Sequence, residues 1–226
     1  MSLVFRVCQG NYNDFLNDYL PHYNATCDLG YISFITGSHD IKRWSVGRDT
    51  EDIKVAYTYV MTMPGIPINY YGDEIGMQYL NITSKEGGRD RTGSRTPMQW
   101  DHGKNLGFSQ SQTPYLPVDP APNAPTVHSQ QQDPDSILNY VKRLIALRKE
   151  HPALCADGTY RTLECGYPLV FERSADSETI RVVINASDKV TTFQDPELSE
   201  CLFSYNAEVN GVTIQLNSRS CVIYSL

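Results

Sequence analysis

Two short apolar segments of this 226-residue chain each stop at a glycine and are followed at once by charged side chains. Residues 31–36 lead into the stretch Gly-Ser-His-Asp, and residues 66–71 lead into Gly-Asp-Glu. Aromatic and β-branched residues that end at a glycine are typical of strands. Between them, over 53–60, apolar residues recur with the three- and four-residue spacing of a helix. A strand, a helix and a second strand in this order predict a parallel βαβ unit with a right-handed crossover, which places the chain in the α/β class.

The helix between the two strands has recognisable ends in the sequence. Asp49 and Asp52 resemble a capping box, in which each side chain bonds the backbone of the other residue. Met-Pro-Gly at 63–65 ends the helix. In parallel α/β folds, functional side chains collect at the carboxyl ends of the strands. The charged residues after both strands fall at that edge, and this coincidence is the first indication of a functional site.

Two further helices are predicted from apolar periodicity. The better defined one covers 135–150, with Asp133 as its N-cap, Pro134 at its first position and a His-Pro dipeptide just beyond its end. An earlier amphipathic helix is expected over 12–19. Both extend the α/β pattern to the segments that flank the two strands.

The sequence pattern changes twice along the chain. Residues 80–132 are rich in Gly, Pro, Gln, Ser and Asn, as expected of a long functional loop or a disordered segment. From residue 155 onward, short strands alternate with turn residues, which predicts a small antiparallel sandwich. Its expected strands are 158–163, 169–173, 179–184, 212–216 and 221–224. We therefore divide the chain into an α/β domain over 1–154 and an all-β domain over 155–226.

The composition limits the kinds of binding partner and the cellular compartment that we expect for this chain. The net charge is −7, from 19 basic and 26 acidic residues, which argues against nucleic acid or an anionic membrane as the main partner. No apolar run approaches the roughly 18 residues of a membrane-spanning helix, and the first residues lack the apolar length of a signal peptide. Six cysteines without any Cys-x-x-Cys pair indicate reduced thiols in a cytoplasmic protein, with neither a disulfide framework nor a metal site.

Ser38, His39 and Asp40, which follow the first strand, allow several interpretations. A Ser-His-Asp nucleophile triad is excluded, because consecutive residues of an extended chain point to alternate faces and cannot converge. A metal site would need further ligands, and the other histidines have no supporting spacing, so we expect neither a metal nor another cofactor. Two interpretations remain from these residues alone: the side chains hydrogen-bond the next turn, or they form one wall of an active site.

Three motifs occur in order along the chain: FITGSHDIKR at 34–43, MPGIPINYYGDEIGM at 63–77 and RDRTGSRTPMQWD at 89–101. In this combination the chain resembles the α-amylase superfamily of glycoside hydrolases, in particular its α-glucosidase, oligo-1,6-glucosidase and trehalose synthase branch. The first motif resembles the end of the family's seventh barrel strand, and the second resembles its eighth strand with the loop that follows. The resemblance implies the C-terminal portion of a (β/α)8 TIM barrel followed by a small all-β antiparallel sandwich domain.

The resemblance also implies roles for the residues after the first strand. Asp40 corresponds to the family's third invariant carboxylate, which holds sugar hydroxyls and stabilises the transition state. His39 corresponds to the neighbouring imidazole, which hydrogen-bonds the same glucose ring. Arg43 falls where many members have an arginine, so we expect it to bind substrate. Ser38 departs from the usual asparagine of the family, and its shorter side chain implies altered positioning of the substrate.

The residues of the second and third motifs each keep more than one interpretation. Asp73 and Glu74 either orient the loop after the second strand or line the rim of the substrate site. Arg89, Arg91 and Arg95 either pair with carboxylates, face a sugar-binding cleft or lie on a solvated surface. The aromatic residues Tyr70, Tyr71 and Trp100 either pack in the core or stack against sugar rings.

Parts of the family's machinery have no counterpart in this sequence. A retaining glycosidase uses two carboxylates about 5–5.5 Å apart, which in this family lie on earlier barrel strands, and a complete barrel takes about 250 residues. We therefore expect a C-terminal fragment of a retaining α-glycosidase, inactive alone, whose parent hydrolyses or transglycosylates oligosaccharide or disaccharide α-glucosides. An open sheet edge predicts self-association. The alternatives are a non-catalytic amylase-like interaction domain, a carbohydrate-binding sandwich, or a trehalose synthase-type isomerase.

Overall fold

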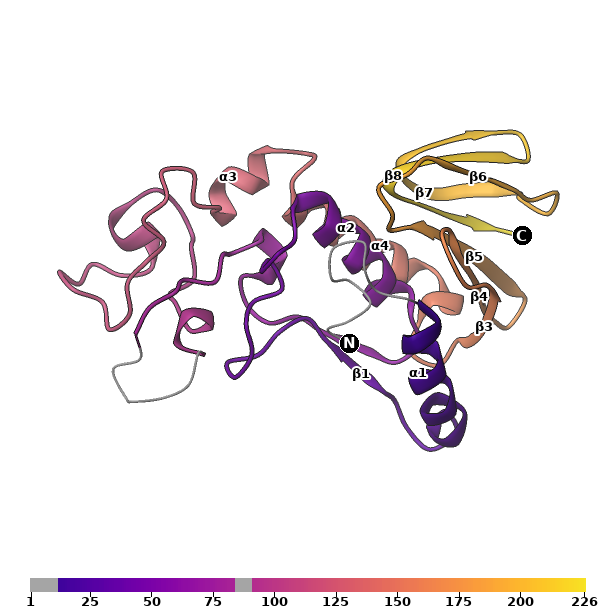
Figure 1. The fold of residues 1–226 in the computed structure, drawn as a ribbon, viewed down its shortest axis with the longest axis horizontal. Helices are drawn as coiled ribbons and strands as arrows, with labels where there is room; N and C mark the ends of the chain where they lie inside the picture. The colour runs from indigo at the N-terminus through magenta and orange to yellow at the C-terminus, as the bar shows by residue number, and fades with distance from the viewer. Residues whose placement is uncertain (1–11, 84–90) are drawn as a thin grey trace. The chain divides into compact units, whose positions relative to one another are not determined.

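The computed structural model describes residues 12–83 and 91–226 of the chain (Figure 1). The described residues form two compact units. One contains the residues up to Phe34 together with 54–67 and 144–226, and the other contains 35–53 and 68–143. Each unit is therefore assembled from segments that lie far apart in the sequence. The division expected at residue 155 stays a prediction.

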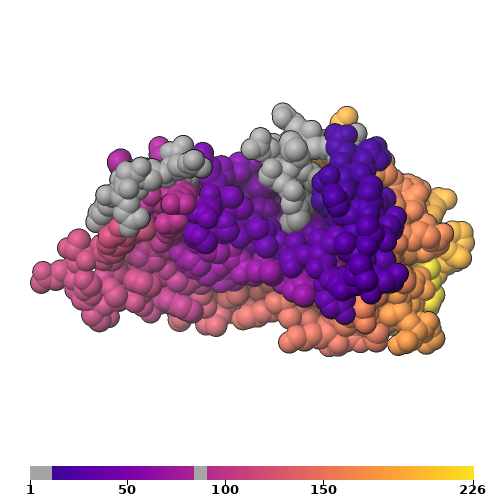
Figure 2. Space-filling model, turned by 90° about the horizontal axis from the view of Figure 1, so that it is seen from below, coloured from indigo at the N-terminus to yellow at the C-terminus, as the bar shows by residue number. Residues whose placement is uncertain are grey.

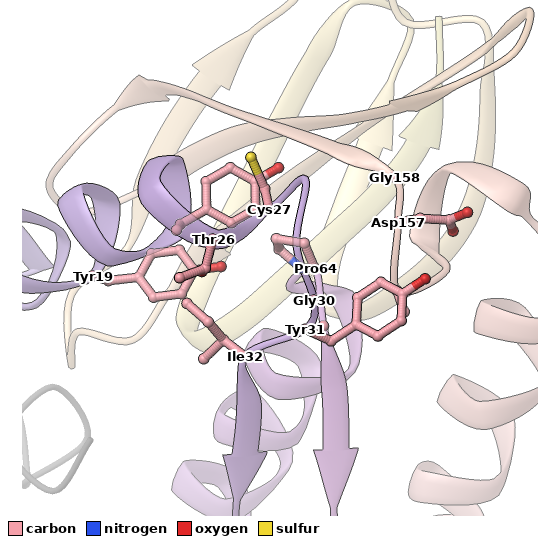
Figure 3. Close-up of a pocket in the computed structure, with 12 residues that line it drawn as sticks. Tyr19, Thr26, Cys27, Gly30, Tyr31, Ile32, Pro64, Asp157 and Gly158 are labelled. Atoms are coloured by element: carbon pink, nitrogen blue, oxygen red, sulfur yellow. The ribbon is translucent and has the colours of Figure 1, made fainter.

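The expected strand–helix–strand unit is present, with shorter strands. β1 (Ser33–Ile35) and β2 (Ile66–Ile68) form a two-stranded sheet, and Figure 3 shows the two strands running in the same direction. α2 (Thr50–Thr62) connects them. The capping box is confirmed: the Asp52 amide donates to Asp49 Oδ1 at 2.8 Å, and the Asp49 amide donates to Asp52 Oδ2 at 3.3 Å. Two backbone donors at the start of α2 thus have partners, which fixes where the helix begins.

Two arginines bond the carbonyl oxygens at the C-terminal end of α2. Arg148 donates to the carbonyls of Met61, Met63 and Gly65 at 2.6, 2.9 and 2.6 Å. The fully buried Arg173 donates to the Thr62 carbonyl, and burial lowers the pKa of its guanidinium. The last carbonyls of a helix have no partner within the helix, so these bonds satisfy groups that would otherwise be buried without one.

Aromatic side chains pack against α1 (Tyr12–Thr26). This helix is longer than the predicted 12–19, and its Tyr12, Leu16 and Tyr19 are buried at the spacing of one helical face. Tyr19 lies 5.5 Å from Phe34 between ring centroids. Beside the C-terminal end of α1 is a cavity of about 20 Å³, shown in Figure 3, which has room for a single water molecule and not for a larger ligand.

The predicted cap of the helix near 135–150 is wrong. The residue that caps α4 (Ile137–Glu150) is Ser136, whose Oγ accepts a hydrogen bond from the Asn139 amide at 3.2 Å. Asp133 instead follows a short helix that the sequence analysis missed, α3 (Val127–Gln132), and its amide donates to the Gln130 carbonyl. α3 consists of polar residues after its first valine, so it has no apolar stripe to reveal it. No described helix combines the length and apolar character that crossing a bilayer requires.

The C-terminal region is all-β and antiparallel, as predicted. Its strands form one six-stranded sheet in the order β3-β4-β5-β8-β6, with β7 paired to the other edge of β8 (Figure 1). The buried core of this sheet consists of Val170, Val183, Ile214, Leu216, Val222 and Tyr224. The strands are β3 (Thr159–Glu164), β4 (Leu169–Ala175), β5 (Glu178–Asn185), β6 (Thr191–Gln194), β7 (Glu200–Asn210) and β8 (Thr213–Ser225).

Two details of this sheet differ from the sequence expectation. The segments 212–216 and 221–224 belong to the single strand β8, which bends where Arg219 takes a φ of 47°. β6 and β7 were not predicted, because both alternate between exposed and half-buried positions and lack a run of buried residues. β7 contains a matching irregularity, since the register shifts between Tyr205 and Ala207 and Asn206 has a φ of 51°.

A charged cluster is buried beside the sheet. Arg181 donates to Glu172, Asp195 and Glu197, and its side chain is 8% exposed. Arg161 bonds Glu172 from the outside at 2.5–2.9 Å, and its own side chain is 70% exposed. The positive charge of Arg181 thus compensates the buried carboxylates of Glu172 and Asp195, which would be costly to bury alone, whereas Glu197 is largely exposed.

Candidate functional site

The turn after β1 is fixed by contacts with Asp73. Thr36 donates its hydroxyl to Asp73 Oδ2 at 2.7 Å and accepts a hydrogen bond from the Tyr70 amide at 3.0 Å. The chain then passes Gly37, where a Cβ atom would lie 2.7 Å from Asp73 Oδ2. Only glycine fits this approach without moving the carboxylate. The turn that carries residues 38–40 is therefore packed against the buried Asp73 carboxylate.

Asp40 lies at the surface of this turn and is surrounded by cationic groups. Its side chain is 50% exposed, and its Oδ1 accepts hydrogen bonds from Arg91 at 2.6 Å and from Arg95 at 3.2 Å. His39 Nε2 lies 3.1 Å from Asp40 Oδ2. The Asp40 amide donates to Ser38 Oγ at 3.2 Å. The structure thus brings Ser38, His39 and Asp40 together with Arg91 and Arg95, which come from the third sequence motif.

The two arginines are positioned by their own backbone segment. η2 (Thr92–Ser94) lies between them, and the buried Ser94 donates its hydroxyl to the Ile41 carbonyl at 2.5 Å. Arg95 Nε also donates to the His39 carbonyl at 2.8 Å. At Gly93, a Cβ atom would lie 1.9 Å from the Leu80 carbonyl oxygen, so this segment packs too closely for any side chain.

These contacts keep Asp40 ionised. Partial desolvation acts to raise its pKa, but the hydrogen bond from Arg91 and the charges of His39, Arg91 and Arg95 outweigh it, and the pKa lies below its usual range. A half-exposed carboxylate that is held in one orientation is a strong acceptor for the hydroxyl groups of a ligand.

Arg43 lies beneath the site and has no exposed side-chain surface. Its Nη1 donates to the Tyr71 carbonyl at 2.8 Å and to Asp73 Oδ1 at 3.4 Å. The guanidinium also lies over the rings of Tyr70 and Tyr71, at 5.4 and 4.9 Å from their centroids. In this structure Arg43 therefore supports the turn from inside and does not reach a surface where a ligand could bind.

The two acidic residues after β2 have different environments. Asp73, in η1 (Asp73–Ile75), is buried, and burial raises its pKa to about 6 despite the opposing effects of the Thr36 hydrogen bond and the Arg43 charge. Glu74 is half-buried and accepts a hydrogen bond from Asn69 Nδ2 at 2.8 Å. Asp73 thus stabilises the turn, whereas Glu74 faces the rim of a cleft. Arg89 lies outside the described residues.

This cleft, hereafter the aromatic cleft, has a volume of about 470 Å³. Its principal side chains are Tyr71, Trp100, Phe108 and Tyr115, with Glu74 and Arg95 among the polar ones. Sequence reasoning named Tyr71 and Trp100 but missed Phe108 and Tyr115. The signal that could have found them is the presence of large aromatic residues in the polar segment 80–132, because such residues usually pack against something.

Within the described part of the chain, no group of three or more His, Cys, Asp or Glu side chains is arranged to hold a metal ion. The described residues bring to the site an anchored carboxylate, an imidazole, two guanidinium groups and nearby aromatic faces.

The chain was compared with known protein families. The family model described as the α-amylase catalytic domain matches residues 6–157. The chain belongs to the α-amylase family. Among the relatives of this family, an oligo-1,6-glucosidase of Parageobacillus thermoglucosidasius is 31% identical over 206 residues, which cover 74% of this chain and 36% of that protein. A trehalose synthase of Thermus thermophilus is 31% identical over 159 residues, which cover 67% of this chain and 16% of that enzyme.

Solved structures with the same fold are also found. A mutant of MutB, from crystals soaked with trehalulose, superposes with a TM-score of 0.83 at 24% identity, covering 98% of this chain and 48% of that one. The expected fold, the C-terminal portion of a TIM barrel followed by an antiparallel β domain, is thereby confirmed. The chain spans less than half the length of these relatives.

Proposed function

We propose that this chain contributes the substrate-orienting part of an active site for α-linked glucosides. Asp40 holds hydroxyl groups of the glucose ring and stabilises the transition state, and His39 hydrogen-bonds the same ring. The observation that carries this proposal is the state of Asp40: it is half exposed to a ligand, yet held ionised and oriented by Arg91, Arg95 and His39.

The geometry suits the chemistry of glycoside cleavage. As the glycosidic bond breaks, the ring acquires oxocarbenium character, and hydrogen bonds to its 2-hydroxyl strengthen by an amount worth several kcal/mol. A hydrogen bond from this hydroxyl to an ionised carboxylate is stronger than one to a neutral acceptor. Ser38 and Arg95 act as positioning residues, because Ser38 bonds the Asp40 amide and Arg95 bonds the His39 carbonyl. Arg43 acts from beneath, through the Tyr71 carbonyl and Asp73.

The bond cleavage itself is assigned to a longer protein that includes this chain. A retaining mechanism needs a nucleophile and an acid/base carboxylate about 5–5.5 Å apart. We propose that the longer protein supplies both from segments that correspond to the remainder of its relatives. It would hydrolyse or transglycosylate disaccharide or oligosaccharide α-glucosides, whereas the isolated chain binds sugar without turnover.

Two measurements on the purified chain test this proposal. It should release no p-nitrophenol from p-nitrophenyl α-glucoside, and measurable turnover would contradict the assignment of the missing carboxylates. Glucose should shift the NMR signals of the His39 imidazole, and Asp40→Asn should abolish that shift. Asp135→Asn, an exposed aspartate before α4, is the matched control and should leave the shift intact. An unchanged response in Asp40→Asn would overturn the role of Asp40.

We also propose that the chain can associate with a second copy. Among the described residues, β1 and β2 pair only with each other, so their outer edges present unpaired backbone groups. Light scattering after size-exclusion chromatography should show a concentration-dependent dimer. A monomer at all concentrations would contradict this proposal.

A further inference from the structure

The turn over residues 37–42, which carries Asp40, is joined to the buried Asp73 at both of its ends. At its start, Thr36 donates its hydroxyl to Asp73 Oδ2 at 2.7 Å, and at its end Arg43 Nη1 lies 3.4 Å from Asp73 Oδ1. These residues belong to one compact unit, found among the violet to pink atoms of Figure 2. A single carboxylate thus connects the two ends of the turn.

Arg43 depends on Asp73 for its counter-charge. The Arg43 side chain has no exposed surface, and among the described residues Asp73 is the only carboxylate paired with it. Its Nη1 also donates to the Tyr71 carbonyl at 2.8 Å, whereas its Nε and Nη2 are buried and have no hydrogen-bond partner within the described part of the chain. If Asp73 lost its charge, this buried guanidinium would be uncompensated, and the end of the turn would rearrange around it.

Thr36 depends on the same charge at the other end of the turn. An ionised Asp73 can only accept hydrogen bonds, so the Thr36 hydroxyl donates to it and accepts from the Tyr70 amide at 3.0 Å. Protonation at Oδ2 would place a second O–H opposite that of Thr36, and one of the two must turn away. A Cβ at Gly37 would lie 2.7 Å from the same oxygen, so the backbone of the turn also packs against it.

The charged and titratable groups that face Asp73 are Arg43 from the first segment and Glu74 and Tyr70 from its own. Burial is the largest effect and raises the pKa of Asp73 to about 6, which the charge of Glu74 supports and the charge of Arg43 opposes. Asp73 therefore changes its charge between pH 7 and pH 5. The pKa of Asp40 lies below its usual range, so its own titration occurs at lower pH.

We propose that Asp73 is a positioning residue that regulates sugar binding at Asp40: its ionised carboxylate keeps the turn in the binding arrangement, and its protonation releases Arg43 and weakens binding. The inference rests on the proposed function, because it takes Asp40 as the group that binds the sugar. It adds that sugar binding weakens between pH 7 and pH 5 through a buried residue that the sugar does not touch.

Stability and sugar binding should respond to pH in opposite directions. The pKa of Asp73 is about 6 when the chain is folded and near 4 when it is unfolded, so the folded state binds more protons between these values. The free energy of unfolding therefore rises as the pH falls from 7 to 5. Sugar affinity falls over the same range. A residue with only a structural role would change both quantities in the same direction.

The experiment measures glucose affinity at pH 7 and pH 5 by NMR titration of the amide signals of residues 38–40. If only the chain with an ionised Asp73 binds glucose, the competent fraction falls from about 0.9 to about 0.1, and the dissociation constant should rise about tenfold. Asp73→Asn, which removes the charge and keeps the shape, should bind weakly at both pH values. Asp135→Asn, at an exposed position before α4, is the matched control and should follow the wild-type chain.

A second measurement needs neither a variant nor a sugar. In the wild-type chain, the amide signals of residues 38–40 should move with the same midpoint as the carboxyl carbon signal of Asp73, because the turn rearranges when Asp73 is protonated. Turn signals that do not follow the titration of Asp73 would overturn the inference, whether or not glucose binds.

The outcomes separate this inference from the proposed function. A loss of affinity toward pH 5 that persists in Asp73→Asn would assign the pH dependence to another group, such as the His39 imidazole. That result, or an equal wild-type affinity at pH 7 and pH 5, would overturn the inference while the role of Asp40 stands. If Asp40→Asn leaves glucose binding unchanged, the proposed function fails, and the regulation by Asp73 fails with it.

Discussion

Thr36, at the carboxyl end of β1, donates its hydroxyl to Asp73 Oδ2 across 37 residues of sequence. Because Arg43 reaches the other oxygen of the same carboxylate, Asp73 joins the segments after β1 and β2 at a single buried group. The position of Asp40 on the turn between Thr36 and Arg43 therefore depends on Asp73, which does not itself reach the surface.

The first prediction concerns the pH dependence of stability. Asp73 has a pKa of about 6 when folded and an ordinary value near 4 when unfolded, so the folded state binds more protons between these values. Its contribution to stability is therefore full below pH 4 and is lost as the pH rises through 6. Relative to Asp73→Asn, the wild-type chain should gain about 1 kcal/mol of unfolding free energy between pH 7 and pH 5.

Urea unfolding at both pH values measures this difference. Asp135→Asn, at an exposed position, is the matched control and should show the same difference from wild type at pH 5 and pH 7. A pH-independent difference for Asp73→Asn would mean that the Asp73 carboxyl titrates normally in the fold.

The second prediction concerns the charge state of Asp40. Arg91→Met removes the hydrogen bond and the charge that hold the Asp40 pKa below its usual range, so that pKa should rise. Carboxyl carbon NMR measures the titration directly, and the acid limb of glucose binding should move to higher pH in the same variant. Lys142→Met, which removes a charge from an exposed position on α4, should leave both unchanged. An unshifted Asp40 titration in Arg91→Met would show that Arg95 and His39 suffice to hold the pKa of Asp40 below its usual range.

The third prediction compares two glycines. Gly93→Ala should destabilise the chain and disturb Asp40, because the new methyl group would meet the Leu80 carbonyl in the segment that carries Arg91 and Arg95. Gly30→Ala is the control, since no atom lies within 4 Å of a Cβ at that position. Thermal unfolding and the His39 signal together report the effect. Equal melting temperatures and equal His39 signals in Gly93→Ala and Gly30→Ala would contradict the close packing at Gly93.

The fourth prediction concerns the charged cluster of the β domain. Arg181→Met leaves Glu172 and Asp195 buried without their shared cation, which should cost about 3–5 kcal/mol of unfolding free energy. Arg161→Met removes an exposed partner of the same Glu172 and should cost less than about 1 kcal/mol. Denaturant unfolding compares the two. Similar losses would indicate that burial of the cluster is not what makes Arg181 important.

Local signals in the sequence predicted part of this structure well. The Asp49–Asp52 capping box, the two glycine-terminated strands and the antiparallel C-terminal region are all present, since each depends on residues close together in the sequence. The cap at Asp133 failed because an unpredicted helix precedes it and the next serine takes the role. β6 and β7 were missed because their exposed positions leave no continuous apolar run.

The candidate site was harder to read from the sequence. A strand end with His39 and Asp40 pointed to a polar cluster, and the motif pattern supplied their expected roles. Tertiary packing decides two features that the sequence does not reveal. Arg43 is buried beneath the turn, and Arg91 and Arg95 contact Asp40 from a segment about 50 residues away. The aromatic cleft depends on it even more, because Phe108 and Tyr115 have no local pattern that marks them as partners of Trp100.

β8 has a consequence for how the chain is made. Its 13 residues pair with β5, β6 and β7, so these three strands share a neighbour that is translated after all of them. Until residues 213–225 leave the ribosome, the buried faces of the earlier strands have no cover on that side. The β domain therefore cannot complete its core before then. Until that point, apolar residues such as Val170 and Val183 stay accessible to chaperones or to other unfinished chains.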